Sequence, residues 1–218
     1  MEKKKPSRIL NVLVACEESQ RVTTEFRLLG HRAFSADLQP CSGGHPEWHI
    51  QGDVLNVFVA HPSFCTASGS RHTFKKWDLI IAHPPCTYLC KVSSLWMIVN
   101  GHLQKERYEK MLAGRAFFLK CLAAPAKFVA VENPLPMARA QLPKPTTFIQ
   151  PFWFGSKWSK KTLLWLKNLP PLMPTIINPI TKGLVHCSRG KYRSRTDRLV
   201  ARAMAKQWSE YIITHYNI

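Results

Sequence analysis

A cysteine that follows two prolines is the clearest candidate for chemistry in this sequence. The motif His83-Pro84-Pro85-Cys86 comes directly after an apolar run that is typical of a buried strand. The two prolines restrict the turn and fix the direction of the next side chain. A thiolate is a strong nucleophile whose reactivity depends on its pKa. We therefore interpret Cys86 as a candidate nucleophile, with a place in the core as the alternative, since a lone cysteine often packs as a small apolar residue.

A carboxyl group follows a second apolar run. Glu132-Asn133-Pro134 comes after Ala130 and Val131. A carboxyl group at the edge of a buried strand is expected to lose solvation, which raises its pKa and suits a group that holds or donates a proton. An Asn-Pro pair is also a common turn signal, so this motif alone fits both a catalytic and a structural role.

The elements that must position these residues alternate between strand and helix. Two helices have clear apolar faces, one carrying Leu112, Ala116, Leu119 and Leu122. The other, near the C-terminal end, carries the apolar residues Leu199, Ala203, Met204 and Trp208. Segment 60–71 is expected to be irregular. The strands are predicted at 9–15, 32–36, 50–55, 78–82, 126–131 and 162–166, and the helices at 19–30, 103–123 and 196–213.

This alternation predicts an open α/β sheet, in which ligands gather at the carboxyl ends of the strands. Polar or reactive residues follow five of the predicted strands. Strands also commonly stop at polar residues, so each of these taken singly has a structural reading. The residues at these five strand ends are Cys16 and Glu17, Asp37, Asp53, Pro84 to Cys86, and Glu132 to Pro134.

The formal net charge of +18 on 218 residues favours a polyanionic partner. A solvated basic surface that aids solubility is the alternative. Clustering of the basic residues near aromatic residues favours nucleic acid, since aromatic faces can stack on bases. Two clusters are Lys157, Lys160 and Lys161 with Trp153, Phe154 and Trp158, and Arg71, Lys75 and Lys76 with Phe74 and Trp77. The third comprises Arg189, Lys191, Arg193, Arg195, Arg198, Arg202 and Lys206.

The seven cysteines are irregularly spaced and include no pair of C-x-x-C units. This spacing argues against a disulfide framework and a structural zinc site, and free thiols predict a reducing cytoplasm. The histidines at positions 45, 49, 61 and 72 match no standard ligand spacing, so no metal is expected. The apolar run 9–16 leads into acidic residues and not into a cleavage site, so we expect neither a signal peptide nor a membrane segment.

Taken together, the Pro-Pro-Cys and Glu-Asn-Pro motifs resemble those of the cytosine-C5 DNA methyltransferases. The chain is most similar to compact phage and bacterial proteins described as DNA methyltransferase-like, and the similarity extends over residues 9–213. The resemblance implies a single class I methyltransferase domain over 1–218, a Rossmann-like open sheet with helices on both faces. Residues 135–190 would hold a small insertion that contacts nucleic acid. The matching stretches are 14–17, 49–54, 82–89, 132–134, 160–162, 164–167, 203–205 and 207–208.

The resemblance also implies a mechanism. Cys86 would add to C6 of a cytosine, and Glu132 would contact ring N3 and the exocyclic amine. C5 would then take a methyl group from S-adenosylmethionine, and loss of the C5 proton would release Cys86. The target base would leave the duplex stack unless it is already single-stranded. Arg193 and Arg195 correspond to a pair that helps to hold the flipped base, with general phosphate binding as the alternative.

Cofactor binding is implied by the same correspondence. Residues Ala15, Cys16 and Glu17 would lie near the methionine part of S-adenosylmethionine, with Pro84 alongside. Asp37 would contact the ribose hydroxyls, and Asp53 the adenine amine. Each of these acidic residues could instead cap a helix or shape a turn. The residues expected to contact DNA beyond the base are Arg189, Lys191, Arg198, Lys160 and Lys161.

The chain departs from the family at two places. The first turn, Ala15 to Ser19, lacks the glycines of the usual cofactor loop, and the chain has no room for a large target-recognition domain, so segments 60–76 and 135–190 would take that role. Two alternatives stay open. One is an enzyme that uses the same thiolate addition on RNA or on a pyrimidine nucleotide. The other is a degenerate scaffold that binds DNA or a host protein.

Overall fold

A sheet of seven strands lies at the centre of the molecule. The computed structural model describes residues 8–179, 181, 185–186 and 194–215. Across the sheet the strand order is β10-β12-β9-β6-β1-β2-β3. The strands are β1 (Asn11–Ala15), β2 (Arg32–Asp37), β3 (His49–Gln51), β6 (Leu79–Ala82), β9 (Phe128–Asn133), β10 (Thr147–Ile149) and β12 (Thr162–Lys167).

Five neighbouring strands of this sheet, from β3 to β9, are parallel, and β12 is antiparallel to both of its neighbours. Numbered by their order along the chain, the seven strands run 3-2-1-4-5-7-6 across the sheet. The direction of winding reverses between β1 and β6, which is where ligands bind in open α/β sheets. The sheet confirms the predicted class I methyltransferase-like, Rossmann-like fold.

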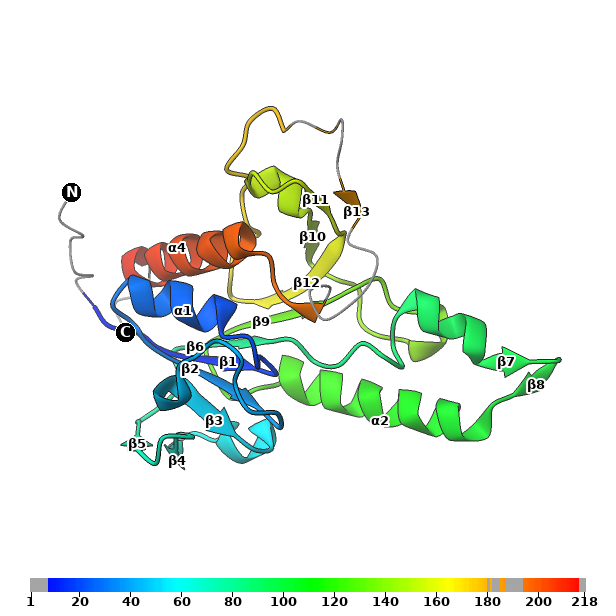
Figure 1. Ribbon diagram of the computed structural model, residues 1–218, viewed down its shortest axis with the longest axis horizontal. Coiled ribbons are helices and arrows are strands. Elements are labelled where there is room, and N and C mark those ends of the chain that lie inside the picture. The colour runs from blue at the N-terminus through cyan, green and yellow to red at the C-terminus, as the bar shows by residue number, and fades with distance from the viewer. Residues whose placement is uncertain (1–7, 180, 182–184, 187–193, 216–218) are drawn as a thin grey trace.

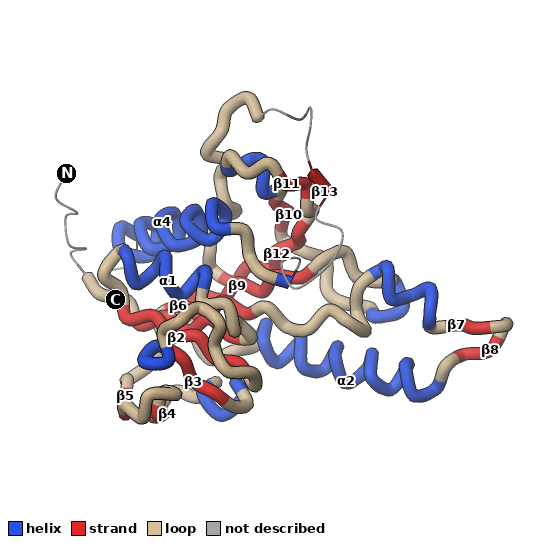
Figure 2. The backbone as a smooth tube through the Cα atoms, viewed as in Figure 1, coloured by secondary structure: helices blue, strands red, loops and turns tan. Residues whose placement is uncertain are grey.

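Helices cover both faces of the sheet. The helices α1 (Arg21–Leu28) and α4 (Arg198–His215) lie on one face, and α2 (Lys105–Leu122) lies on the other (Figure 2). Side chains alternate along β1, so that Val12 and Val14 pack with α1 and α4, whereas Leu13 and Ala15 pack in the core that contains α2. Because helices cover both faces of the sheet, side chains on both sides of β1 and β6 are buried, and both strands are therefore almost entirely apolar in sequence.

The smaller strands form separate pairs outside the central sheet. One of these pairs, β7 and β8, forms a hairpin that projects with the first turns of α2 beyond the rest of the molecule (Figure 1). The pairs are β4 (Ser63–Cys65) with β5 (Arg71–Thr73), β7 (Ile98–Val99) with β8 (His102–Leu103), and β11 (Trp158–Ser159) with β13 (Val185–His186).

Most predicted elements are present, but two loops differ from the expectation. The third strand stops at Gln51 and does not reach 55, because Asp53 caps a short 3-10 helix, Val54–Val57, by accepting a hydrogen bond from the Leu55 amide at 2.9 Å. Segment 60–71 is not irregular throughout, since it contains β4 and the start of β5.

Four of the five aromatic residues expected at a nucleic-acid surface pack in or against the core. Trp77 is fully buried, and its indole N–H donates to the Val57 carbonyl at 2.9 Å. Phe74 packs at its edge against Trp77, with ring centroids 5.3 Å apart, and both rings also lie beside Phe34 of β2. In this cluster the aromatic rings fill the sheet face that the β4–β5 hairpin covers. In the other cluster, Phe154 is buried and Trp153 packs against the core that contains α4, whereas Trp158 is exposed.

Segment 135–190 supplies part of the central sheet. Its strand β12 pairs antiparallel with β9, and β10 pairs antiparallel with β12. In this register Leu164 lies opposite Glu132. The segment therefore helps to hold one of the candidate catalytic residues in place.

The buried face of α2 differs from the predicted one. Met111, Phe118 and Cys121 are buried against the sheet, whereas the predicted Leu112 and Leu119 are exposed. The helix carries apolar residues on more than one side, so spacing alone did not select the correct face. By contrast, the predicted apolar face of α4 is confirmed, with Ala203, Met204 and Trp208 buried and Leu199 packed against them.

Adjacent residues of α2 test this orientation. Phe118 is 0% exposed and Leu119 is 37% exposed. We expect Phe118→Ala to lower the free energy of unfolding by about 3–5 kcal/mol, because it leaves a cavity beside Trp165. Leu119→Ala should cost about 1 kcal/mol or less. Urea denaturation measures both, and equal losses would contradict the placement of the helix.

Candidate active site

The carboxyl ends of the parallel strands bring the candidate residues to one edge of the sheet. Because β1, β2, β3, β6 and β9 are parallel, the turn that follows β1, the loop that follows β6 and the end of β9 lie on the same side. Neighbouring strands β1, β6 and β9 hold Cys16, Cys86 and Glu132 at or just beyond their ends. The predicted gathering of these residues is thus built into the strand order.

The loop that carries Cys86 is fixed on both sides. The His83 amide donates to the Ala15 carbonyl at 2.9 Å, which extends the pairing of β6 with β1. The buried Pro84 carbonyl accepts a hydrogen bond from Asn133 Nδ2 at 2.8 Å. The Cys86 carbonyl then accepts the amides of Leu89 and Cys90, both at 3.0 Å, so a turn begins at Cys86. As a whole residue, Cys86 is half-buried.

Glu132 contacts a histidine from the Cys86 loop. His83 Nδ1 lies 3.1 Å from Glu132 Oε2, and only 9% and 14% of these two side chains are exposed. Burial acts to raise the pKa of Glu132. The hydrogen bond from His83, the charges of Lys160 and His83 and a hydrogen bond from Thr162 outweigh burial and lower the pKa below its usual range.

This lowered pKa corrects the sequence-based expectation for Glu132. Loss of solvation alone would have raised the pKa of Glu132 and favoured its protonated form. Hydrogen bonds to the charged form decide the balance in favour of a carboxylate. In this state Glu132 accepts hydrogen bonds and does not bring a proton of its own.

The Cys86 thiol has a raised pKa. Burial is the largest cause, and the nearby Cys90 and Glu132 add to it, whereas a hydrogen bond from a backbone amide and the charge of Lys160 oppose it. Glu132 and Cys86 therefore interact through space, and Lys160 acts on both. The thiol form predominates at neutral pH in this state, so the sulfur must lose its proton before it can act as the predicted nucleophile.

The two neighbouring lysines differ in their surroundings. Lys160 is half-buried next to the site, and its backbone amide donates to Gln150 Oε1 at 3.0 Å. Lys161 is exposed, and its Nζ lies 4.4 Å from the centre of the Phe148 ring. Of this pair, Lys160 is thus the cation of the site, and Lys161 belongs to the outer surface.

The first turn combines an unusual backbone with a buried carboxylate. Cys16 has a φ of 59°, in the region that favours glycine, and both its amide and that of Glu17 donate to the Ala36 carbonyl. The Glu17 carboxylate accepts hydrogen bonds from the Val22 amide at 2.6 Å and from the amide and hydroxyl of Thr23. Glu17 caps α1, and burial raises its pKa, while its predicted place beside the cofactor stays a prediction.

Two aspartates lie near this turn. Burial raises the pKa of Cys16, and the charges of Cys121, Asp37 and Asp53 raise it further, so both aspartates act electrostatically on the Cys16 thiol. Each aspartate uses Oδ1 locally, Asp37 for the Gln39 amide and Asp53 for the Leu55 amide, both at 2.9 Å. Within the described part of the chain, neither Oδ2 has a hydrogen-bond partner.

The structure also shows the contacts or exposure of three other predicted site residues, Ala15, Arg195 and Arg198. Ala15 is fully buried, so it offers a ligand little more than the shape of the strand end. Arg195 pairs with Glu18 Oε1 at 3.4 Å and donates to Ser42 Oγ at 2.9 Å, which ties the segment before α4 to the first turn. Arg198 is exposed at the start of α4. The predicted residues Arg189, Lys191 and Arg193 lie outside the described residues.

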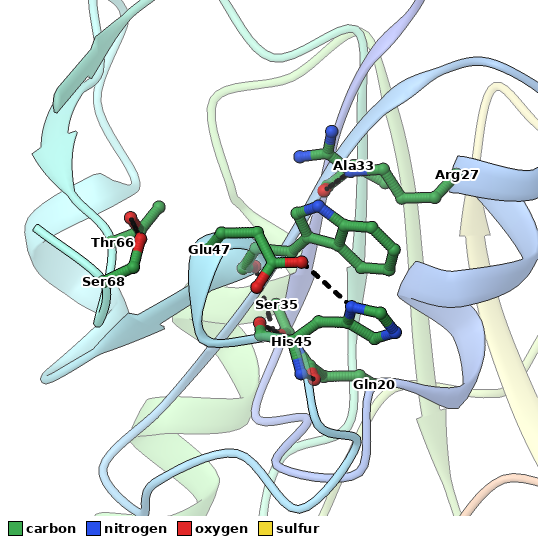
Figure 3. Close-up of polar contacts among 9 residues, drawn as sticks. Gln20, Arg27, Ala33, Ser35, His45, Glu47, Thr66 and Ser68 are labelled. Atoms are coloured by element: carbon green, nitrogen blue, oxygen red, sulfur yellow. Dashed lines mark hydrogen bonds and ion pairs between the residues drawn. The ribbon is translucent and has the colours of Figure 1, made fainter. Parts of the chain in front are cut away.

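A shallow hollow beside the C-terminal half of α1 lies away from these groups. It is lined in part by Arg27, His31 and Trp48, which precede the amino-terminal ends of β2 and β3. The polar groups around it satisfy one another. Glu47 contacts the His45 ring at 2.9 Å, and Arg27 Nε donates to the Ala33 carbonyl at 2.6 Å (Figure 3). This hollow is therefore at the opposite edge of the sheet from Cys86.

Two residues of the site received no role from sequence reasoning. His83 lies inside the Pro-Pro-Cys motif, and Asn133 lies inside the Glu-Asn-Pro motif. Their contacts, His83 to Glu132 and Asn133 to Pro84, join the two motifs across β6 and β9. The sequence did carry a signal for these two residues, because each motif contains a polar residue besides the reactive one. His83 stands three positions before Cys86, and Asn133 directly follows Glu132.

Searches for a metal site and a membrane segment cover the described residues. Among them, no group of three or more histidine, cysteine, aspartate or glutamate side chains could hold a metal ion. No helix in the same part of the chain has both the length and the apolar character to cross a bilayer.

Comparisons with known proteins give little at the level of sequence. No family model matches the chain, and no curated protein matches it. Among solved structures, the chain is similar to an E. coli prophage protein described as a proposed DNA modification methyltransferase. The two share 14% identity at a TM-score of 0.46, over 79% of this chain and 53% of the other, so the chain spans about half the length of that protein. The function is therefore inferred from the site itself.

Glu132 raises the pKa of Cys86 and Lys160 lowers it, so both residues should change the rate at which this thiol reacts with an alkylating reagent. We expect iodoacetamide to modify Cys86 more slowly at pH 7.5 than an ordinary exposed cysteine, because its raised pKa leaves less thiolate. Glu132→Gln should lower this pKa and speed the modification several-fold, and Lys160→Gln should slow it. Peptide mapping by mass spectrometry follows each site, with the exposed Cys65 as internal control. Unchanged rates in both variants would contradict the electrostatic coupling.

Proposed function

We propose that this protein is an S-adenosylmethionine-dependent methyltransferase that modifies C5 of cytosine in DNA through a covalent bond to Cys86. The observation that supports this function most directly is the arrangement of Cys86, Glu132 and Lys160. A half-buried thiol, an ionised carboxylate and a cation act on one another at the strand ends where such sheets bind ligands.

Glu132 suits recognition of cytosine in its ionised form. The exocyclic amine of cytosine is a hydrogen-bond donor, whereas thymine and uracil present a carbonyl oxygen at the same position. A carboxylate accepts from the amine and repels the carbonyl. The hydrogen bonds that lower the pKa of Glu132 therefore favour cytosine over the other pyrimidines.

Cys86 supplies the nucleophile. Its sulfur must lose a proton before it adds to C6, and the raised pKa makes this step a part of the barrier. Lys160 is the cation that stabilises the thiolate. The prolines at 84 and 85 hold the loop, and the turn that begins at the Cys86 carbonyl fixes its other end.

The residues at the ends of β1, β2 and β3 fit a nucleoside cofactor. Asp37 and Asp53 each have a carboxylate oxygen without a partner in the described structure, and both lie close to the Cys16 turn. Asp37 would accept from the ribose hydroxyls and Asp53 from the adenine amine, with Ala15, Cys16 and Pro84 forming the walls. When bound, S-adenosylmethionine supplies an electrophilic methyl group.

The basic surface suits DNA as the substrate. The net charge is +18, and both Lys161 and Arg198 are exposed. We propose that these residues bind phosphates together with Arg189, Lys191 and Arg193, and that the parts of 135–190 outside the central sheet contact the nucleic acid. Arg195, which is held by Glu18 and Ser42, would join the cofactor end to this surface.

A scaffold that binds nucleic acid without catalysis is the second candidate. The raised pKa of Cys86 favours it, as does a cysteine at a positive φ in the first turn, where glycine is the usual residue. The presence of an ionised Glu132 within the electrostatic range of the sulfur opposes it, because binding alone has no need of this pair.

Cofactor binding can be measured without catalysis. We expect S-adenosylmethionine to bind the wild-type chain in calorimetry, and Asp53→Asn to weaken binding about 10- to 100-fold, since it removes a charged acceptor. Glu210→Gln, on the exposed side of α4, is the matched control and should bind as the wild type does. Wild-type protein that binds no cofactor would favour the second candidate.

Methyl transfer tests the proposed function itself. With labelled S-adenosylmethionine, we expect label at C5 of cytosine in DNA, a loss of about 10³-fold or more in Cys86→Ser, and full activity in the control variant Glu210→Gln. DNA that contains 5-fluorocytosine should trap the protein covalently through Cys86. Label in RNA alone would make RNA the substrate, and the absence of label from both would refute the proposal.

A further inference from the structure

His83 has no role in the function proposed so far, yet it is built into the site. Its ring is more than nine-tenths buried, and its Nδ1 lies 3.1 Å from Glu132 Oε2. Its backbone amide is fixed to Ala15, so the ring is held at the end of β6. Within the described structure, the buried Nε2 has no hydrogen-bond partner. Because a buried polar atom without a hydrogen-bond partner is unfavourable, packing alone does not explain a histidine at this place beside Glu132.

The charged and titratable groups around His83 come from four elements. Glu132 of β9 contacts the ring directly, and Glu17 of the turn after β1 interacts with it electrostatically. Lys160, which precedes β12, acts on Glu132, and Cys86 lies on the same loop as His83. Cys90 lies farther along that loop. The ring therefore faces two carboxyl groups, Glu132 by direct contact and Glu17 through space.

The proposed reaction needs a proton at the pyrimidine ring. When a thiolate adds to C6, the negative charge moves onto N3 unless a proton neutralises it. Glu132 is the group expected to contact N3, but its hydrogen bonds keep it ionised at neutral pH. A carboxylate can pass a proton on only after it has received one, and histidine is the side chain that ordinarily holds and releases protons near neutral pH.

We propose that His83 is a positioning residue that orients Glu132 and delivers a proton through it to N3 of the cytosine. The inference rests on the proposed function. As the Cys86 sulfur bonds to C6, the π pair of C5=C6 shifts to C4–C5 and that of C4=N3 becomes a lone pair on N3. N3 takes a proton from Glu132, and Glu132 takes one from Nδ1 of the imidazolium, which becomes a neutral ring with its proton on Nε2. The reverse transfers accompany the release of Cys86.

The variant His83→Asn tests this role. Asparagine Nδ2 can take the place of Nδ1 as a hydrogen-bond donor to Glu132, but it cannot deliver a proton. We expect single-turnover methyl transfer to fall about 10²- to 10³-fold, with unchanged dissociation constants for DNA and cofactor. The wild-type rate should rise with pH as Cys86 ionises and fall again as the imidazolium is lost. The descending limb should be absent in the variant.

A readout without cofactor separates the addition step from methyl transfer. Addition of Cys86 to C6 also permits exchange of the C5 hydrogen of cytosine with deuterated water, and this exchange should slow in His83→Asn by the same factor as methyl transfer. His102→Asn changes an exposed histidine outside the proposed site and should leave both rates as they are. Thermal melting compares the folds, and His83→Gln replaces the asparagine variant if the latter does not fold.

The outcomes distinguish the two proposals. A wild-type protein that methylates DNA, together with a folded His83 variant that has the same rate and pH profile, refutes the proton transfer and leaves the proposed function standing. A variant with lower rates but an unchanged descending limb reduces His83 to a structural role and also refutes it. A wild-type protein that transfers no methyl group and exchanges no C5 hydrogen refutes both.

Discussion

The parallel pairing of β6 with β1 on one side and with β9 on the other is the constraint on which the site depends. It brings together residues 86 and 132, which are far apart in the sequence, and it does so at the point where the winding of the sheet reverses. The hydrogen bonds from His83 to Ala15 and from Asn133 to Pro84 extend this pairing past the strand ends. Because interior strands buried on both faces cannot slip without exposing apolar side chains, the distances in the site are fixed by the core.

At this edge of the sheet, the number of hydrogen bonds decides which of the two partly buried acidic groups, Glu132 or Cys86, is ionised. Glu132 and Cys86 both lose solvation, and Lys160 favours the ionised form of both. Glu132 also receives hydrogen bonds from two side chains, His83 and Thr162, so its charged form is favoured despite burial. The sulfur has only a backbone amide and the charge of Lys160 in its favour, and burial prevails. The site in this state thus combines a ready acceptor with a nucleophile that has yet to be activated.

The first turn shows how the fold compensates for an unusual sequence. A cysteine occupies a backbone conformation that glycine adopts more readily, and two amides on the same carbonyl hold it there. Glu17 replaces the usual short capping residue of α1 from a position four residues before the helix begins. The turn is therefore rigid, and the aspartates after β2 and β3 remain next to it.

The sequence by itself determined six of the seven central strands but not β10, the three helices, the two motifs at the ends of β6 and β9, and the basic composition. These features are local, since each depends on apolar runs, turn residues or composition. Tertiary structure alone decided the buried face of α2, where Phe118 and not Leu119 meets the sheet, and the place of Trp77 in the core. It also decided the charge of Glu132 and the contact with His83, because solvation and hydrogen bonds depend on neighbours that are distant along the chain.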